Sequence, residues 1–277
     1  MKKIIGLFIL LALLSCSNPP QDSVMLKIQF KPGTKYRQTT ERTSQTVIKY
    51  DGSAISLQRL RARGIQNPTI TSKKFLKEST LTAGKSTDGI NFPFTVEVVK
   101  AESNDGKKDL SEGAVFHGLC STGKMPIFES VTSDELDSKS KVALLQTLQN
   151  SFSQLSFPEK KLKIGEQFSV EYPLSIPMEG STIEMVVTNQ YKLVRISNSM
   201  ADFDVSQLYV MSPTVLNNSF KGTGTGKGQL IYDMANHIVL KNTLDTEIEI
   251  NKKLDSFEFN LKTKGGFIQS TSIETNN

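Results

Sequence analysis

Alternating hydrophobic and polar residues run through most of the chain after Met25, and this period of two is the signature of β-strands. Residues 244–250 place leucine, threonine and isoleucine on one face and acidic side chains on the other. Residues 257–262 repeat the alternation with phenylalanine and leucine. Strands with one apolar and one solvated face belong to antiparallel sheets. The pattern predicts a mainly β (α+β) protein with roughly ten to thirteen strands, forming a curved antiparallel sheet or half-barrel.

Two short segments, residues 30–36 and 162–168, share one order of residue types: apolar, lysine, any residue, glycine, two further residues, aromatic. Each places a glycine turn just before a long alternating stretch. We predict a single β-rich domain over 25–277. A duplicated sheet-building unit, with two halves that meet near 157–162, and a chance match between two short segments would both explain the repetition.

One segment has a helical period instead. Thr132 and Glu135 fit a capping box, in which each side chain bonds the backbone of the other. Leucine and phenylalanine then recur at helical spacing, and Pro158 ends the pattern. This predicts one long amphipathic helix packed on the sheet, either as a plain packing helix or as a lid over an apolar groove. The side chains that would line such a groove are Leu144, Leu148, Phe152 and Leu155.

Glycine recurs at every second position between Lys221 and Gly228. This spacing fits neither a Rossmann turn nor a phosphate-binding loop, and a strand pattern follows it. In an extended segment, Gly222, Gly224, Gly226 and Gly228 share one face. A face without side chains favours a bent strand or the close approach of another element. The alternative is the floor of a groove in which an extended ligand lies.

Arg59, Arg61 and Arg63 alternate with apolar residues. In a strand the three guanidinium groups would share a face, which could meet a phosphate or a lipid headgroup. A solvated outer face is the simpler interpretation, and a helix would separate Arg61 from the other two.

The N-terminus has the pattern of a lipoprotein leader. Lys2 and Lys3 precede an apolar run over residues 4–14, which is too short to span a bilayer, and Leu-Leu-Ser-Cys ends at Cys16. Residues 1–16 resemble the signal peptide and lipobox of bacterial lipoproteins.

The resemblance implies that residues 1–15 are removed as a signal peptide and that Cys16 carries acyl chains such as palmitate. Residues 16–24 then form a lipidated tether. Ser17 after the cysteine implies anchoring in the outer membrane of a Gram-negative cell, with the periplasmic and outer faces both left open.

Charge and composition argue against several classes of function. Removing Lys2 and Lys3 lowers the formal charge from +5 to +3, too weak and scattered for a nucleic-acid binder. His117 and Cys120 would lie on opposite faces of a strand, so we expect no metal site. No motif for nucleophilic catalysis is present. We therefore expect no catalytic residues, no metal and no cofactor.

Residues 162–168 and the run from Gly222 to Asp233 are together similar to an uncharacterised family of bacterial lipoproteins common in Bacteroidota. The resemblance implies an envelope lipoprotein of unknown function and supplies no catalytic residues.

Two functions follow from these observations. The first is a cell-envelope lipoprotein without enzymatic activity that binds a lipid or other hydrophobic ligand on its curved sheet. The second is a structural or protein-interaction lipoprotein without a small-molecule ligand. The expected partners are the membrane, reached through the acyl chains, and a lipid or an envelope protein. A fully packed core beneath the helix would favour the second function.

Overall fold

A computed structural model describes residues 22–106, 111–153, 157, 160–178, 181–211, 220–253 and 256–275. Cys16, the leader and most of the tether lie outside these residues. The chain is mainly β, with one large antiparallel sheet in the order β6-β5-β4-β3-β2-β13-β12-β11-β10-β9-β8. The strands of this sheet are β2 (Thr34–Gly52), β3 (Thr69–Ala83), β4 (Asn91–Ser103), β5 (Val115–Ser121), β6 (Ile127–Thr132), β8 (Gln167–Met178), β9 (Ser181–Ser197), β10 (Met200–Met211), β11 (Phe220–Asp233), β12 (Ile238–Lys253) and β13 (Phe257–Thr275).

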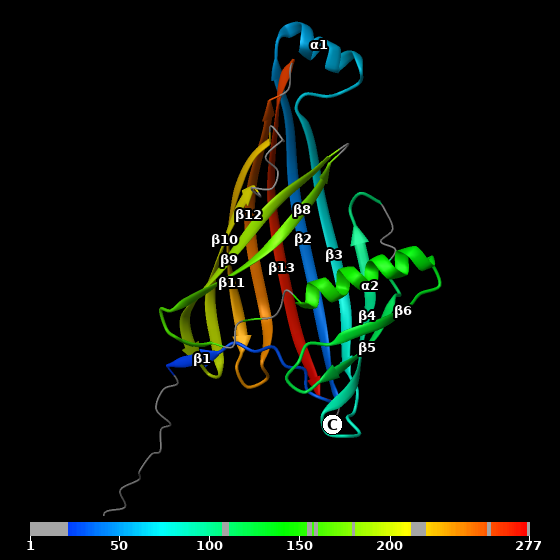
Figure 1. Cartoon of the computed structure of the whole chain (residues 1–277), viewed down its shortest axis with the longest axis vertical. Helices are drawn as coiled ribbons and strands as arrows, with labels where there is room; N and C mark the ends of the chain where they lie inside the picture. Colours follow the sequence, from blue (N-terminus) through cyan, green and yellow to red (C-terminus); the bar gives the residue numbers. More distant parts are fainter. Residues whose placement is uncertain are drawn as a thin grey trace, which may run out of the picture.

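The sheet consists of two meanders joined side by side. Strands β2 to β6 follow one another on one side, and β8 to β13 follow one another on the other. The seam is the pair β2–β13, whose register runs from Phe257↔Gly52 to Thr275↔Thr34. The sheet does not close, because β6 and β8 are its two edges. Figure 1 shows β8 and β9 crossing in front of the long central strands, so the sheet is strongly curved.

A separate two-stranded sheet lies at the lower end of the molecule in Figure 1. It pairs β1 (Ser23–Met25) with β7 (Lys161–Lys163) in antiparallel register. Val24 and Leu162 face each other across this pair and are almost fully buried. The pair therefore anchors the start of the described chain to the domain.

The described residues contain two helices, where the sequence predicted one. The predicted helix is α2 (Ser138–Ser153), and it begins later than expected. Thr132 ends β6 instead of capping the helix, and the cap is Asp137, whose Oδ1 accepts a hydrogen bond from the Ser140 N–H at 2.7 Å. An Asp cap satisfies a free N–H group at the first turn in the same way as the expected threonine.

The second helix, α1 (Ala54–Ala62), connects β2 to β3 at the upper end of the molecule (Figure 1). Ser53 caps it by accepting a hydrogen bond from the Ser56 N–H. The strand interpretation of Arg59, Arg61 and Arg63 was wrong, because these residues lie in the helix and at its C-cap. Their alternation with apolar residues is therefore not a strand pattern. Within the described residues, neither helix is long and apolar enough to cross a membrane.

Buried side chains on the concave face of the sheet fall into two groups. The lower cluster, centred on Phe30, Phe94 and Tyr232, draws on the N-terminal segment, α2 and the lower ends of the strands. The upper cluster lies near α1 and consists of sheet side chains. Its buried members are Ile183, Met185, Val187, Tyr209, Phe220, Ile250 and Phe259.

Both edges of the sheet are protected against pairing with another chain. On β6, the Gln149 side chain of α2 accepts a hydrogen bond from the Phe128 N–H at 2.9 Å. On β8, Pro173 and Pro177 lack N–H groups, and proline is confined to edges within sheets.

Candidate functional site

The predicted helix stripe packs into a filled aromatic core. Phe152 is 7% exposed, and its ring centroid lies 5.1 Å from that of Phe128 and 6.2 Å from that of Phe94. Leu144 and Leu148 are partly buried and pack against the same cluster. Leu155, the fourth residue predicted to line a groove, lies outside the described residues. The described part of the stripe therefore packs as part of the core.

The four glycines lie in β11, and their neighbours fill the space above them. A Cβ at Gly222 would meet the Met211 Sδ at 3.0 Å and the Ile250 side chain at 3.2 Å. A Cβ at Gly226 would meet Gln207 at 3.1 Å. The side chains that occupy this face come from β10 and β12, whereas α2 packs next to β6. The structure thus does not bring the helix stripe and the glycines together as the two walls of one groove.

A row of small and polar residues crosses the sheet between the two clusters. Its members are register partners on neighbouring strands, and their side chains point to the concave face. We call this set the polar row. From β9 to β3 it consists of Asn189, Gln207, Gly226, Thr246, Gly265, Ser44 and Lys73.

A groove of about 710 Å³ runs across five neighbouring strands at the level of the polar row. Its lining comes in runs of three residues, and each run is centred on a member of the row. Since side chains alternate along a strand, the flanking residues of each run point to the face opposite the clusters. The lining thus includes residues from both faces of the sheet and no member of either apolar cluster, and we call this groove the outer groove. Its lining is 43–45, 72–74, 225–227, 245–247, 264–266 and Asn104.

Small residues explain why the sheet is hollowed at this level. Gly265 and Gly266 are consecutive, and a Cβ at Gly266 would meet the Thr43 Oγ1 at 2.7 Å. Gly226 removes a side chain from the middle of the row on β11. With so little bulk at this level, the backbone itself forms much of the floor of the groove.

Charged groups line the walls of the outer groove. The Lys264 Nζ lies 3.7 Å from the Glu247 Oε1 in an exposed ion pair. Lys74 and Lys227 add two further cations, and Asp245 adds an anion. The lining contains hydroxyl, amide and charged groups but no aromatic ring, so it has no surface on which a sugar could stack.

The edge of β3 borders one end of the groove. β4 pairs with β3 only from Phe75 onward. Asn104 continues the pairing: its Oδ1 accepts from the Lys74 N–H at 2.7 Å, its N–H donates to the Lys74 carbonyl oxygen at 3.0 Å, and its Nδ2 donates to the Ser72 carbonyl oxygen at 3.5 Å. Beyond this point, from Thr69 to Lys73, β3 has only β2 as a strand partner. Backbone groups of this stretch therefore lie beside the groove.

Sequence reasoning did not find this groove, because it depends on the register of five strands. The glycine run in β11 was noticed, but its partners across the sheet cannot be read from one chain segment. The Gly265–Gly266 pair, within a strand of strong alternation, was the one local signal available.

His117 and Cys120 do not converge. The His117 Nε2 lies 3.1 Å from the Thr132 Oγ1 on the outer face, whereas Cys120 is buried. Burial raises the pKa of the Cys120 thiol to about 11, so it stays protonated and unreactive at neutral pH. Among the described residues, no group of three or more histidine, cysteine or acidic side chains is arranged to hold a metal ion.

Comparisons with known proteins do not assign this chain to a family. No protein-family model and no curated protein matches the chain. Among solved structures, an outer-membrane channel from Pseudomonas putida F1 shares 8% sequence identity, covers 93% of this chain and 99% of its own, and has a TM-score of 0.22. Ail, the attachment invasion locus protein of Yersinia pestis, shares 6% identity, covers 86% and 99% of the two chains, and has a TM-score of 0.15.

Proposed function

We propose that this chain is a lipid-anchored protein of the bacterial outer membrane, without enzymatic activity, that binds a polar segment of a partner protein in the outer groove. The observation that carries the proposal is the groove itself, an open surface lined by polar residues and glycine, with no member of either apolar cluster.

The packing beneath α2 supports a protein partner over a hydrophobic ligand. A lid over an apolar groove would leave its inner side chains in contact with empty space. Phe152 instead lies within 6.2 Å of the rings of Phe30, Phe94 and Phe128. The upper cluster is filled in the same way by its own side chains.

The chemistry of the outer groove suits a polypeptide segment. Its hydroxyl and amide groups can bond peptide groups, and the free edge of β3 offers backbone donors and acceptors for an added strand. Lysines on its walls exceed acids, because Lys74, Lys227 and Lys264 outnumber Asp245 and Glu247. Lys73 is not counted, since it forms an ion pair with Asp105. We therefore expect the bound segment to carry net negative charge.

The proposed anchor rests on the leader alone. Cys16→Ser should abolish acylation and release the mature protein from the membrane fraction. Continued incorporation of labelled palmitate by this variant would overturn the anchor without bearing on the groove.

A photo-crosslinking amino acid at Thr225, in the groove, tests the binding site in cells that express the full chain. We expect a discrete protein adduct from Thr225 and none from Ser270, an exposed position on β13 away from the groove. Lys227→Glu combined with Lys264→Glu should lower the adduct yield severalfold, because both cations line the groove.

Lys241→Glu provides the matched control, since this exposed lysine lies on the same outer face of β12 but outside the groove. Equal adducts at Thr225 and Ser270 would contradict the groove as the binding site. A lipid that copurifies with the full-length protein in native mass spectrometry, with no protein adduct, would restore the hydrophobic-ligand function.

A further inference from the structure

The small β1–β7 sheet has two contrasting faces. Val24 and Leu162 point inward and are 2% and 1% exposed. Met25, Lys161 and Lys163 beside them are exposed and project from the domain, whereas Ser23 is buried. Alternation along two very short strands thus produces an outward surface at the lower end of the molecule.

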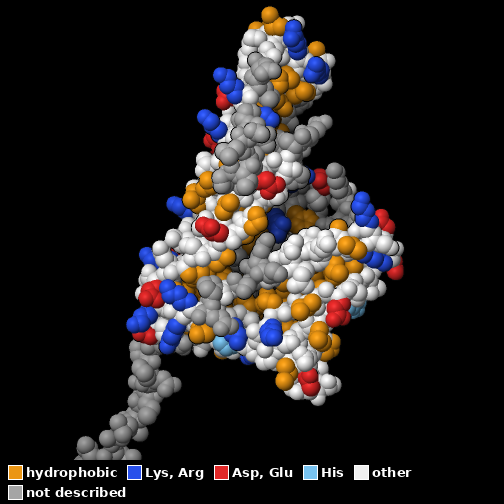
Figure 2. Space-filling model, viewed as in Figure 1, with side chains coloured by type: hydrophobic (Ala, Val, Ile, Leu, Met, Phe, Trp, Pro, Cys, Tyr) orange, Lys and Arg blue, Asp and Glu red, His pale blue; other side chains and the backbone are white. Residues whose placement is uncertain are grey.

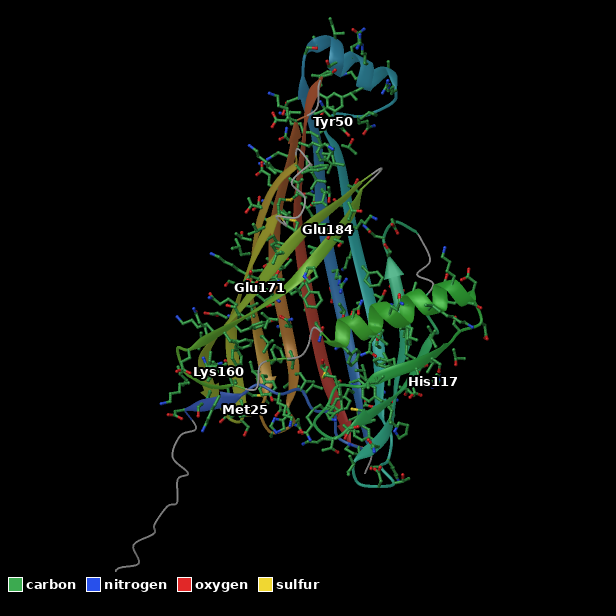
Figure 3. All side chains as sticks on the ribbon, in the orientation of Figure 1. Met25, Tyr50, His117, Lys160, Glu171 and Glu184 are labelled. Carbon is green, nitrogen blue, oxygen red and sulfur yellow. The ribbon has the colours of Figure 1, made fainter. Side chains whose placement is uncertain are left out.

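This outward surface combines apolar and basic side chains. Met25 is 47% exposed and Ile164 is 51% exposed. Lys160, Lys161 and Lys163 are exposed beside them. In the described part of the chain, no salt bridge joins these three lysines to an acid. Figure 3 places Met25 and Lys160 together at this end, and Figure 2 shows basic side chains there with acidic ones among them.

The surface lies where the tether joins the domain. The Ile164 N–H bonds the Asp22 carbonyl at 3.3 Å, which fixes the first described residue next to it. Six residue steps separate Asp22 from Cys16, and an extended chain of that length spans about 20 Å. With Cys16 anchored, the outward surface cannot move further than this from the headgroups.

We propose that the surface formed by Met25, Lys160, Lys161, Lys163 and Ile164 docks onto the anionic headgroups of the bilayer that holds the tether. This inference rests on the proposed lipid anchor. The lysines would meet lipid phosphates, while the thioether and isoleucine side chains would enter the interface. The long sheet would then stand away from the membrane, with the outer groove and α1 held clear of it (Figure 1).

The absence of tryptophan from the sequence allows a direct test. Ile164→Trp gives a single fluorescent reporter at the surface, and Ile55→Trp gives a matched reporter on α1 at the opposite end, where Ile55 is 64% exposed. The mature chain from residue 16 is coupled through the Cys16 thiol to a maleimide lipid, which supplies the anchor whether or not cells acylate it. Cys120 is buried and does not compete.

Vesicles of phosphatidylcholine, with and without phosphatidylglycerol, carry a nitroxide quencher on their headgroups. We expect strong quenching at position 164 only in the anionic vesicles, and none at position 55 in either. Lys160→Glu, Lys161→Glu and Lys163→Glu together should weaken the quenching about tenfold or more, because each lysine near an anionic surface contributes severalfold to binding. High salt should have the same effect.

Reversal of Arg59, Arg61 and Arg63 to glutamate changes net charge by the same amount at the far end of the molecule. This control should leave quenching at position 164 unchanged. Equal quenching in neutral vesicles, equal loss with the arginine variant, or no quenching at all would each overturn docking. Because the anchor is supplied chemically, these outcomes are separate from any failure of acylation in cells or of binding in the outer groove.

Discussion

The lower and upper clusters bury the same face of one sheet in two different ways. The lower cluster has a covering layer, formed by α2 and by the N-terminal segment that includes Leu26, Ile28 and Phe30. The upper cluster has no helix within it, and the curved sheet supplies side chains from β8 and β9 on one side and from β12, β13 and β2 on the other. The comparison shows that a sheet long enough to extend past its helix must curl on itself to bury apolar residues.

The polar row lies between the lower and the upper cluster. Gly226 and Gly265 leave little to pack at that level, and Gln207 and Asn189 replace apolar residues on the strands beside them. Because few apolar contacts cross the row, we expect the upper cluster to open more readily than the lower one.

The largest effect should come from the lower cluster. Phe94 is fully buried and contacts the rings of Phe30, Phe128 and Phe152. Phe94→Ala should lower the free energy of unfolding by ~3–5 kcal/mol, measured by denaturant unfolding. A loss below ~1 kcal/mol would mean that the covering layer contributes little, and that the two clusters do not differ as described.

The upper cluster should respond locally. Phe259→Ala removes a ring that lies 5.8 Å from that of Tyr50 and should cost ~2–4 kcal/mol. Native-state hydrogen exchange should show faster exchange in the upper ends of β9, β12 and β13, with the lower ends unchanged. Equal acceleration in both regions would show that the polar row does not divide the sheet into two cooperative units.

The glycines at the boundary should differ in importance. A Cβ at Gly224 would meet the Glu247 carbonyl oxygen at 2.8 Å, and backbone of a paired strand cannot easily move. We expect Gly224→Ala to cost ~1–3 kcal/mol in thermal or denaturant unfolding. Gly266→Ala is the matched control, because the Thr43 hydroxyl can rotate away and the loss should stay below ~1 kcal/mol. Equal losses would refute this ranking.

Alkaline pH should weaken both regions. Burial raises the pKa of Tyr209 in the upper cluster and of Tyr232 in the lower cluster to about 12 each. A phenol whose folded pKa exceeds its unfolded value of 10.0 contributes stability that is present below pH 10 and lost as pH rises toward 12. The fall in stability between these values should shrink in Tyr209→Phe, measured by unfolding at a series of pH values.

Tyr232→Phe should shrink the alkaline loss as well, but with an added cost at neutral pH. The Tyr232 hydroxyl donates to the Lys27 carbonyl oxygen at 2.7 Å and lies 3.0 Å from the His237 Nδ1. These contacts fix the N-terminal segment over the lower cluster. An unchanged stability at neutral pH would show that the hydroxyl is not needed to hold this covering segment.

Much of the fold could be predicted from local pattern. The alternation in β12 and β13 and the α2 stripe depend only on neighbours along the chain, so they can be recognised without knowledge of the tertiary structure. Helix α1 was missed, because its arginines and apolar residues also fit a strand of period two. Its deciding feature, the Ser53 cap, is a single side chain that sequence reasoning did not consider.

The candidate site was less accessible to sequence reasoning. The helix that carries Phe152 was predicted to be either a plain packing helix or a lid, and the packing of Phe152 against Phe30, which lies 122 residues earlier in the chain, favours the packing helix. The outer groove joins residues as distant as Thr43 and Lys264, which become neighbours through the β2–β13 register. Such a site depends on long-range pairing, and no local pattern encodes it.

The smallest effect should come from the outer face, which lies behind both clusters and contributes to neither. The ion pairs Lys262–Glu249, at 3.2 Å, and Lys264–Glu247, at 3.7 Å, join adjacent strands there and are exposed. Double-mutant cycles should give each pair no more than ~1 kcal/mol, because solvent screens exposed charges. Lys264 lines the outer groove whereas Lys262 does not, so Lys264→Gln should lower crosslinking at Thr225 while Lys262→Gln should not. A similar fall in both variants would indicate that the overall charge of this face, and not the groove, attracts the partner.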